Sequence, residues 1–270
     1  AQVDVVDAGT LDRLFARRNL IFTVLFCGFC MGCLALMSDF GTALIFFVAF
    51  LCIAFLRTGD LPSIVMITAA AGFAGGIVLR FKPYVLARFA VWRHAWEYAQ
   101  KGGYQQTRTM SAVASGGLFG AGPEEAWLKY VGAANTDLVF GVVSEEFGLL
   151  LALCAAAAVI LLGIYALRAA GRSRSSFYAI AACATAAMLV FQTTLNVLGS
   201  VDLLPLTGVT FPFVSMGGSS MLSCWGLLAY LKAADVRLPP EEKSPEDKPE
   251  KPARKREGFF EDMPEIPVDE

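Results

Sequence analysis

The sequence predicts an all-α integral membrane protein with about six transmembrane helices, one long extracytoplasmic loop and a broken last helix. Of its 270 residues, 56% are hydrophobic and only 17% are charged, and the mean hydropathy is +0.57. Buried helices of soluble proteins usually keep a polar face, which most of the apolar segments here lack. The segments long enough to cross a hydrocarbon layer of about 30 Å are residues 20–37, 40–56, 61–79, 147–167, 177–199 and roughly 208–231.

These segments divide the chain into five predicted regions. They are a cytoplasmic lead (1–19), three transmembrane helices (20–79), an extracytoplasmic loop with interfacial helices (80–137), three further transmembrane helices (138–232) and a disordered cytoplasmic tail (233–270). The tail is rich in Pro, Glu, Asp and Lys, a composition that buries too little apolar surface to fold.

Basic residues in the short connections predict the orientation in the membrane. Arg57 follows the second segment, Arg172 and Arg174 lie between the fourth and fifth, and Lys232 follows the last. Short loops rich in Lys and Arg remain in the cytoplasm, so we expect both termini there. The long loop is also basic, but long loops are translocated with less regard for charge.

One polar stretch, residues 104–146, separates apolar segments and is the candidate functional centre. Asp137 lies where the loop meets the fourth span, and Glu145 and Glu146 follow about two turns later; at about 1.5 Å per residue, Glu145 is roughly 12 Å further along that helix. Polar groups at membrane depth cost a few kcal/mol each, so they need a reason to be there. Asp137 suits a general base or cation ligand, which needs its charge, or a helix N-cap, which needs only an oxygen acceptor.

The glycine-rich residues 116–122 have two interpretations. Their backbone N–H groups are suited to a phosphate, but the glycines alone favour a flexible turn beside an interfacial helix. The segment lacks the GK[ST] ending of a nucleotide-binding loop, so no nucleotide is predicted. The seven cysteines lie within apolar segments without a matching set of histidines, which favours packing over a metal site. A net charge of −2 gives no indication of a nucleic-acid partner.

The last two segments carry polar groups and helix breakers. Gln192 and Asn196 are four residues apart, so they share one helical face and either bond to a neighbouring helix or line a cavity. Pro212 and the pair Gly217–Gly218 interrupt the sixth segment. Broken backbone at membrane depth is tolerated only when it is buried in protein or lines a polar cavity.

Four stretches, in order and at fitting spacing over roughly residues 15–235, resemble the SEDS (shape, elongation, division and sporulation) family, which includes FtsW and RodA. They are SDFGTA at 38–43, GYQ at 103–105 with SGGLFG at 115–120, TDLVF at 136–140 with EEFG at 145–148, and FPFVSMGGSS at 211–220. Met216 replaces the family's usual Tyr and Ser38 its usual Pro.

The resemblance implies a peptidoglycan glycosyltransferase of the bacterial cytoplasmic membrane that serves elongation, division or sporulation. It implies lipid II, a disaccharide-peptide on a polyprenyl pyrophosphate, as substrate and a class B penicillin-binding protein as partner. The family is expected to have about ten spans, of which this chain supplies the last six. The first four help to enclose the substrate cavity, so we expect the chain alone to be inactive.

The implied chemistry assigns roles to individual residues. Asp137 is the expected base, and Arg88, Arg108 or a divalent cation (Mg or Mn), which Asp137 is suited to hold, neutralises the leaving pyrophosphate. Glu145 and Glu146 are expected to shape or hydrate the cavity. The predicted substrate-binding residues are Arg88, Arg108, Gly116, Gly117, Glu145, Glu146, Gln192, Asn196, Ser215, Gly217, Gly218, Ser219 and Ser220.

Two other functions are compatible with the same residues. Broken helices and intramembrane carboxylates also suit a lipid II flippase or another transporter, although no internal repeat is visible. A non-catalytic scaffold that positions a penicillin-binding protein is the second alternative.

Overall fold

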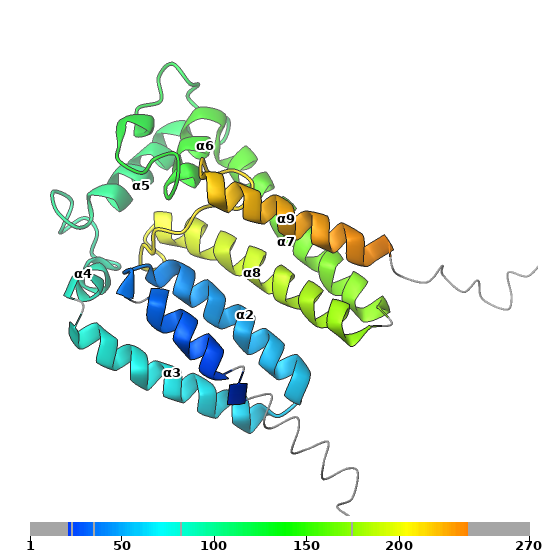
Figure 1. Cartoon of the computed structure of the whole chain (residues 1–270). Coiled ribbons are helices and arrows are strands. Elements are labelled where there is room, and N and C mark those ends of the chain that lie inside the picture. The colour runs from blue at the N-terminus through cyan, green and yellow to red at the C-terminus, as the bar shows by residue number, and fades with distance from the viewer. Residues whose placement is uncertain (1–20, 23, 35, 82, 174, 237–270) are drawn as a thin grey trace, which may run out of the picture. The chain divides into compact units, whose positions relative to one another are not determined.

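The computed structural model describes residues 21–22, 24–34, 36–81, 83–173 and 175–236. Every regular element in these ranges is a helix (Figure 1). The predicted lead (1–19) lies outside the described residues, as does the predicted tail, except that residues 233–236 belong to the last helix. The helices are α2 (Phe40–Thr58), α3 (Leu61–Phe81), α4 (Pro83–Val91), α5 (Tyr104–Gly116), η1 (Leu128–Tyr130), α6 (Val139–Phe147), α7 (Leu149–Arg172), α8 (Ser176–Ser200) and α9 (Gly218–Val236).

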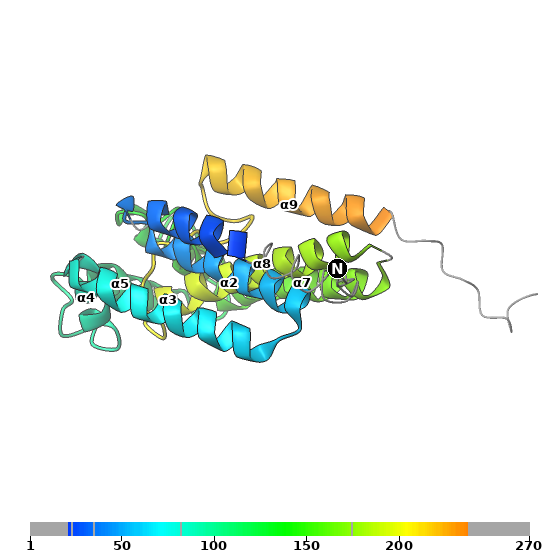
Figure 2. The same ribbon diagram turned by 60° about the horizontal axis from the view of Figure 1, so that its bottom comes forward.

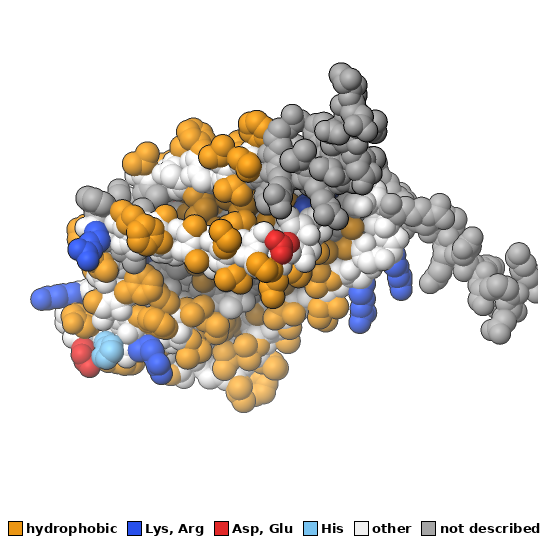
Figure 3. All heavy atoms as spheres, turned by 90° about the horizontal axis from the view of Figure 1, so that it is seen from below, with side chains coloured by type: hydrophobic (Ala, Val, Ile, Leu, Met, Phe, Trp, Pro, Cys, Tyr) orange, Lys and Arg blue, Asp and Glu red, His pale blue; other side chains and the backbone are white. Residues whose placement is uncertain are grey.

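Several of these helices are strongly apolar, which confirms the predicted fold class. Within the described residues, α2, α7 and α8 are long and apolar enough to cross a membrane, and Val24–Leu34 and Leu61–Ile77 are shorter apolar helical stretches. The number of six spans stays a prediction. Figure 3 shows hydrophobic side chains over much of the face on which α3 lies, with Lys and Arg toward its ends. This distribution suits contact with lipid.

The helix α8 packs against α7 and against α2 and lies between them (Figure 1; turned by 60° in Figure 2). Small residues let α7 and α8 approach closely as an antiparallel pair, because Ala166 and Ala170 near the end of α7 meet Ala182 and Ala186 near the start of α8. The helices α2 and α8 are also antiparallel, but here the contact lies between the start of α2 and the end of α8. The buried cluster at this contact contains Ile45, Leu195 and Val209.

The ends of α2 and α7 therefore lie at the same end of the bundle. Arg57 is in the last turn of α2 and Arg172 in the last turn of α7. The opposite end carries α4, α5 and α6 (Figure 1). This arrangement agrees with the charge-based expectation that both basic connections lie on one side of the membrane; which side that is stays a prediction.

The helix expected to continue from Asp137 through Glu145 into the fourth span (147–167) is divided into two helices, α6 and α7, which separate at Gly148. Gly148 has φ +94°, and a Cβ there would lie 2.3 Å from Leu118 O, so the crossing backbone demands glycine. Leu149 N and Leu150 N donate to Gly117 O (2.9 Å) and Leu118 O (3.3 Å). These bonds satisfy first-turn donors of α7 that have no partner within the helix.

The predicted sixth span also begins later than expected. Residues 201–217 are not helical and α9 starts at Gly218, so the expectation of a helix from about residue 208 is wrong. Gly208 and Phe213 have φ +74° and +64°, and Pro212 cannot donate a backbone bond. The result is a partly buried irregular segment, residues 201–217, that returns from α8 to α9.

Candidate functional site

Asp137 lies in the turn that ends the long loop, two residues before α6. Its backbone N donates to Ala133 O at 3.0 Å. The N-cap of α6 is Leu138, without a side-chain capping bond. The interpretation of Asp137 as a helix N-cap is therefore wrong, and so is its placement on the same helix as Glu145.

The guanidinium of Arg88 and the carboxylate of Asp137 meet at Gly208. A Cβ on Gly208 would lie 3.3 Å from Asp137 Oδ2 and 3.7 Å from Arg88 Nη1. Arg88 Nη1 also donates to Leu206 O at 2.7 Å. The loop helix α4, the turn before α6 and the irregular segment after α8 thus bring one cation and one anion together.

The surroundings of Asp137 raise its pKa above the usual carboxyl value. Burial is the largest cause, and the negative charge of Asp39 acts in the same direction. A hydrogen bond from the side chain of Thr136 and the positive charge of Arg88 act in the opposite direction. A raised pKa makes the carboxylate a stronger base than one in water, which suits proton abstraction.

The segment 207–220 is attached to α8 by polar side chains. Gln192 Nε2 donates to Thr210 O and to Thr210 Oγ1, both at 3.0 Å, and Thr210 Oγ1 lies 2.7 Å from Ser220 Oγ. Asn196 Nδ2 donates to Val209 O at 2.7 Å and to Asp137 O at 2.9 Å. Of the two interpretations of Gln192 and Asn196, hydrogen bonding between elements is the one that these contacts show.

The start of α9 carries the remaining predicted residues of the last motif. Ser215 is 2% exposed, and its Oγ donates to Thr136 O at 2.6 Å. Met221 N donates to Gly217 O at 2.8 Å and opens α9. Gly218 and Ser219 are exposed, and the position of a Cβ on Gly218 meets nothing within 4 Å. Gly218 and Ser219 are therefore the accessible ones among the residues of this motif that were predicted to bind substrate.

Glu145 is buried, 1% exposed, and holds the turn around η1. Its Oε1 accepts from Trp127 N at 3.1 Å and its Oε2 from Leu128 N at 2.9 Å. Glu146 is only half-buried. The contacts of Glu145 are structural, whereas the predicted role of either carboxylate toward a substrate stays a prediction.

The glycine-rich residues 116–122 pack against α6 through their backbone. Ala121 N and Gly122 N donate to Glu145 O (2.8 Å) and Glu146 O (3.1 Å), and Gly120 N donates within the turn to Gly116 O (2.8 Å). These three N–H groups are therefore engaged in internal bonds. A phosphate cradle built from these three N–H groups is therefore not present in this structure, and the segment begins as a turn that follows α5.

Arg108 lies exposed on α5, beside aromatic rings. Its guanidinium carbon is 5.2 Å from the ring centroid of Tyr104 and 6.0 Å from that of Trp127, within reach of a cation–π contact. Of the two predicted arginines, Arg88 is the one whose charge acts on Asp137 among the described residues.

A family model covering FtsW, RodA and SpoVE, described as "Cell cycle protein", matches residues 10–238. The chain belongs to this family. The SEDS resemblance predicted from the four motifs is thereby confirmed.

Curated relatives of this SEDS chain carry consistent names. "Peptidoglycan glycosyltransferase RodA" of Mycobacterium leprae is 35% identical over 197 residues, which cover 72% of this chain and 42% of the relative. "Probable peptidoglycan glycosyltransferase FtsW" of Coxiella burnetii is 32% identical over 230 residues, covering 80% and 60%; its counterpart in Bacillus subtilis is 30% identical, covering 78% and 54%. The chain spans about half the length of these relatives.

The fold of the SEDS chain also resembles a solved structure. A chain from "Structural coordination of polymerization and crosslinking by a peptidoglycan synthase complex" aligns with a TM-score of 0.63 and 22% identity, over 80% of this chain and 61% of that chain. At this identity the likeness shows the fold alone.

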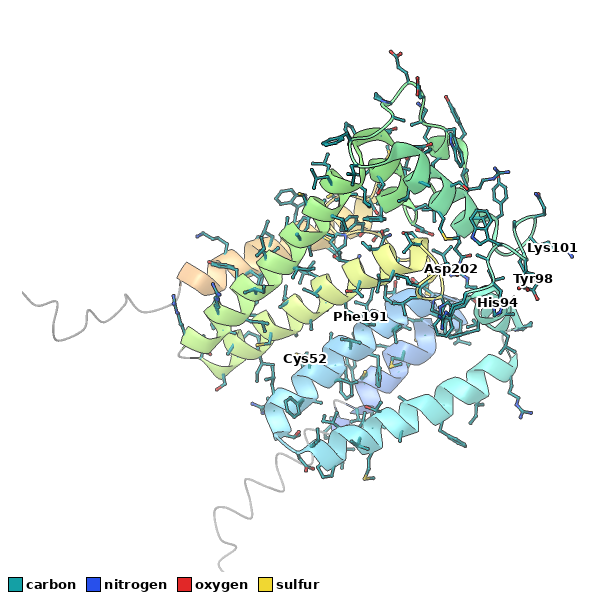
Figure 4. All side chains as sticks on the ribbon, turned by 180° about the vertical axis from the view of Figure 1, so that it is seen from behind. Cys52, His94, Tyr98, Lys101, Phe191 and Asp202 are labelled. Carbon is teal, nitrogen blue, oxygen red and sulfur yellow. The ribbon has the colours of Figure 1, made fainter. Side chains whose placement is uncertain are left out.

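Two acidic residues of this SEDS chain escaped the sequence-based site prediction. Asp39 caps α2, since Thr42 N donates to its Oδ1 at 3.0 Å, and its charge acts on Asp137. Asp202, labelled in Figure 4, accepts from Arg93 N (3.1 Å) and Gln106 Nε2 (3.4 Å). Asp39 stands within a motif and was a detectable candidate, whereas nothing in the local sequence marks Asp202.

The predicted divalent cation finds little support in the ligand set. Within the described residues, no group of three or more His, Cys, Asp or Glu side chains is arranged to hold a metal ion. The carboxylate of Asp137 has the guanidinium of Arg88 beside it. The residues described do not fit a protein-held metal, and the chemistry derived below uses the side chains alone.

Proposed function

We propose that this chain carries the catalytic carboxylate of a peptidoglycan glycosyltransferase, which polymerises lipid II into glycan strands during cell elongation, division or sporulation. The observation that carries the proposal is the placement of Asp137: a partly buried carboxylate with a raised pKa beside the guanidinium of Arg88. The names of the relatives support peptidoglycan glycosyl transfer as the reaction.

The geometry supports one balanced step. The carboxylate of Asp137 removes the proton from an acceptor sugar hydroxyl, and the hydroxyl oxygen forms a bond to the anomeric carbon of the donor. The bond from that carbon to the pyrophosphate oxygen breaks, and polyprenyl pyrophosphate leaves with the electron pair. The cationic Arg88 stabilises the charge that develops on the leaving group. General-base assistance of this kind contributes typically 10²–10⁴-fold.

The step requires the site to open to the side of the membrane that carries the sugars. Asp137 and Arg88 both approach Gly208, and α4, α5 and α6 lie at one end of the helices (Figure 1). This arrangement supports a site at the membrane surface under the predicted topology. The solved structure with the same fold is described as part of a peptidoglycan synthase complex. We propose a class B penicillin-binding protein as the partner, which would crosslink the strands.

Reconstitution of the full-length protein in liposomes with labelled lipid II tests the proposal. Glycan polymer that depends on the protein supports glycosyl transfer. Movement of lipid II across the bilayer without polymer would identify a transporter. The protein would be a scaffold if it neither polymerises nor moves lipid II, alone or with its penicillin-binding partner, and is still needed for assembly of that partner in cells.

A further inference from the structure

Three successive backbone carbonyls in front of α6 each accept a hydrogen bond from a distant part of the chain. The three bonds run from Met216 N to Asn135 O (2.8 Å), from Ser215 Oγ to Thr136 O (2.6 Å) and from Asn196 Nδ2 to Asp137 O (2.9 Å). The backbone on which the Asp137 side chain stands is therefore attached to α8 and to the segment before α9.

The two side-chain donors have no freedom to serve another group. Asn196 and Ser215 are each 2% exposed. The amide of Asn196 also donates to Val209 O at 2.7 Å, and Ser215 Oγ accepts from Phe211 N at 2.7 Å. A hydroxyl has one proton to donate, so the bond to Thr136 O uses the donor capacity of Ser215.

The amide oxygen of Asn196 is buried and has no hydrogen-bond partner in the described part of the chain. The side chain therefore contributes through its two N–H donors. These join the turn before α6 to the segment around Val209, on the side where the neighbouring Gly208 approaches the carboxylate of Asp137. The segment to which Asn196 is bonded at Val209 also contains Leu206, whose carbonyl oxygen accepts from Arg88 Nη1.

We propose that Asn196 and Ser215 are positioning residues, which hold Asp137 in place for catalysis, and that they do not contact the substrate. The proposal rests on the proposed function, in which Asp137 is the base, and it replaces the substrate-binding role predicted for both residues. Fixing the backbone at three consecutive carbonyls fixes the Cβ of Asp137, so the carboxylate retains only its two side-chain torsions. A displacement of about 1 Å in a reacting group can reduce the rate on the order of 100-fold.

The test compares Ser215→Ala, Ser215→Thr and Asn196→Ala in the full-length protein, with lipid II polymerisation measured as kcat and KM. Ser215→Ala and Asn196→Ala should reduce kcat by about 10- to 100-fold and leave KM within about 2-fold, because they displace the base and not the substrate. Ser215→Thr keeps the hydroxyl and should recover most of the rate. Ser223→Ala is the matched control, since its Oγ donates to Ser219 O within α9 (2.8 Å) and to no other group among the described residues.

A double variant separates positioning from general damage to the fold. Residues that act as one unit are not additive, so Asp137→Asn combined with Ser215→Ala should polymerise no more slowly than Asp137→Asn alone. A further loss of the same size in the double variant would show that Ser215 acts independently of Asp137 and would overturn the proposal. A raised KM with unchanged kcat in Ser215→Ala would also overturn it, because that result identifies a substrate contact.

The outcomes distinguish this proposal from the function on which it rests. An Asp137→Asn variant with normal polymerisation would refute the role of Asp137 and with it the proposed mechanism. An inactive Asp137→Asn variant beside unaffected Ser215→Ala and Asn196→Ala variants would overturn the positioning role alone. If Ser215→Ala does not fold, Asn196→Ala provides the same comparison from α8, with Thr194→Val as its control. In the described part of the chain, the Thr194 hydroxyl donates to Val190 O of its own helix (2.8 Å) and to nothing else.

Discussion

The carboxylate of Glu145 accepts a hydrogen bond from the backbone N of Leu128 at 2.9 Å, and the second oxygen of the same carboxylate accepts from Trp127 N at 3.1 Å. A glutamate in an apolar sequence thus satisfies two backbone donors of a loop. Buried N–H groups without partners cost about 1–3 kcal/mol each. The first role of Glu145 is therefore to fold the loop before Asp137.

Replacing Glu145 by Gln tests this role. The amide nitrogen would face one of the two N–H donors, so that bond is lost and two donors oppose each other. We expect the free energy of unfolding to fall by about 1–3 kcal/mol, measured as a lower thermal transition of the full-length protein in detergent. Glu146→Gln is the control, because Glu146 is only half-buried. Unchanged stability together with lost polymerisation would instead assign Glu145 to the substrate.

Asp137→Asn is expected to abolish the base and keep the fold. Asn has nearly the same shape, but it cannot accept a proton from the acceptor hydroxyl. We expect polymerisation of lipid II to fall by roughly two to four orders of magnitude, with thermal stability and membrane insertion close to those of the unchanged protein. Asp137→Glu should retain a small part of the activity, because the charge is present but displaced by one methylene group. Near-normal polymerisation by the Asn variant would move the search for the base to Glu146, because both carboxylate oxygens of Glu145 already accept backbone hydrogen bonds.

Much of this arrangement was predictable because its signals are local. Hydropathy predicted the helices, since a segment that crosses lipid must satisfy its own backbone and cover it with apolar side chains. Asp137 was predictable as a charged residue at the boundary between a loop and an apolar segment. The membership of the SEDS family was predictable from four motifs in order.

What the sequence did not predict depends on contacts between distant segments. The separation of α6 from α7 follows from the approach of the Leu118 backbone to Gly148, and local patterns do not report such an approach. The choice of Arg88 over Arg108 as the cation near Asp137 depends on how α4 and α5 are placed. The hydrogen bond from Ser215 Oγ to Thr136 O joins residues 79 positions apart, and local sequence patterns do not report a bond of that kind.

The orientation in the membrane is open to direct measurement. The basic ends of α2 and α7 lie at the end of the helices opposite α4, α5 and α6, and the positive-inside rule assigns that end to the cytoplasm. In a background without the seven native cysteines, Gly102→Cys should react with an impermeant maleimide in intact cells and Ser173→Cys should not. Labelling at position 173 before the cells are lysed would reverse the predicted topology and place Asp137 on the cytoplasmic side.

The pH dependence of polymerisation provides a test of the electrostatics around Asp137. The base must be ionised, so the rate should rise with pH through the pKa of Asp137. A free Asp side chain has a pKa of about 3.9, and burial raises the pKa of Asp137 above that value. The raised pKa of Asp137 also affects the stability of the fold, because the folded state binds the proton more tightly than the unfolded state does. The contribution of Asp137 to the free energy of unfolding therefore falls as pH rises between the two pKa values.

The rising part of the pH–rate profile, called the limb below, is moved in opposite directions by two neighbouring charges. The charge of Arg88 lowers the pKa of Asp137 and that of Asp39 raises it. In Arg88→Gln the limb should therefore move to higher pH, in addition to a loss of rate from the missing cation. In Asp39→Asn it should move to lower pH, while α2 keeps its cap because Asn caps helices about as well as Asp.

The measurement is the initial rate of lipid II polymerisation over a pH series, with Glu146→Gln as the control for a carboxylate that is not expected to set the limb. Shifts in the same direction for both variants would show that a group other than Asp137 sets the pH dependence, and the base would then have to be sought elsewhere in the loop.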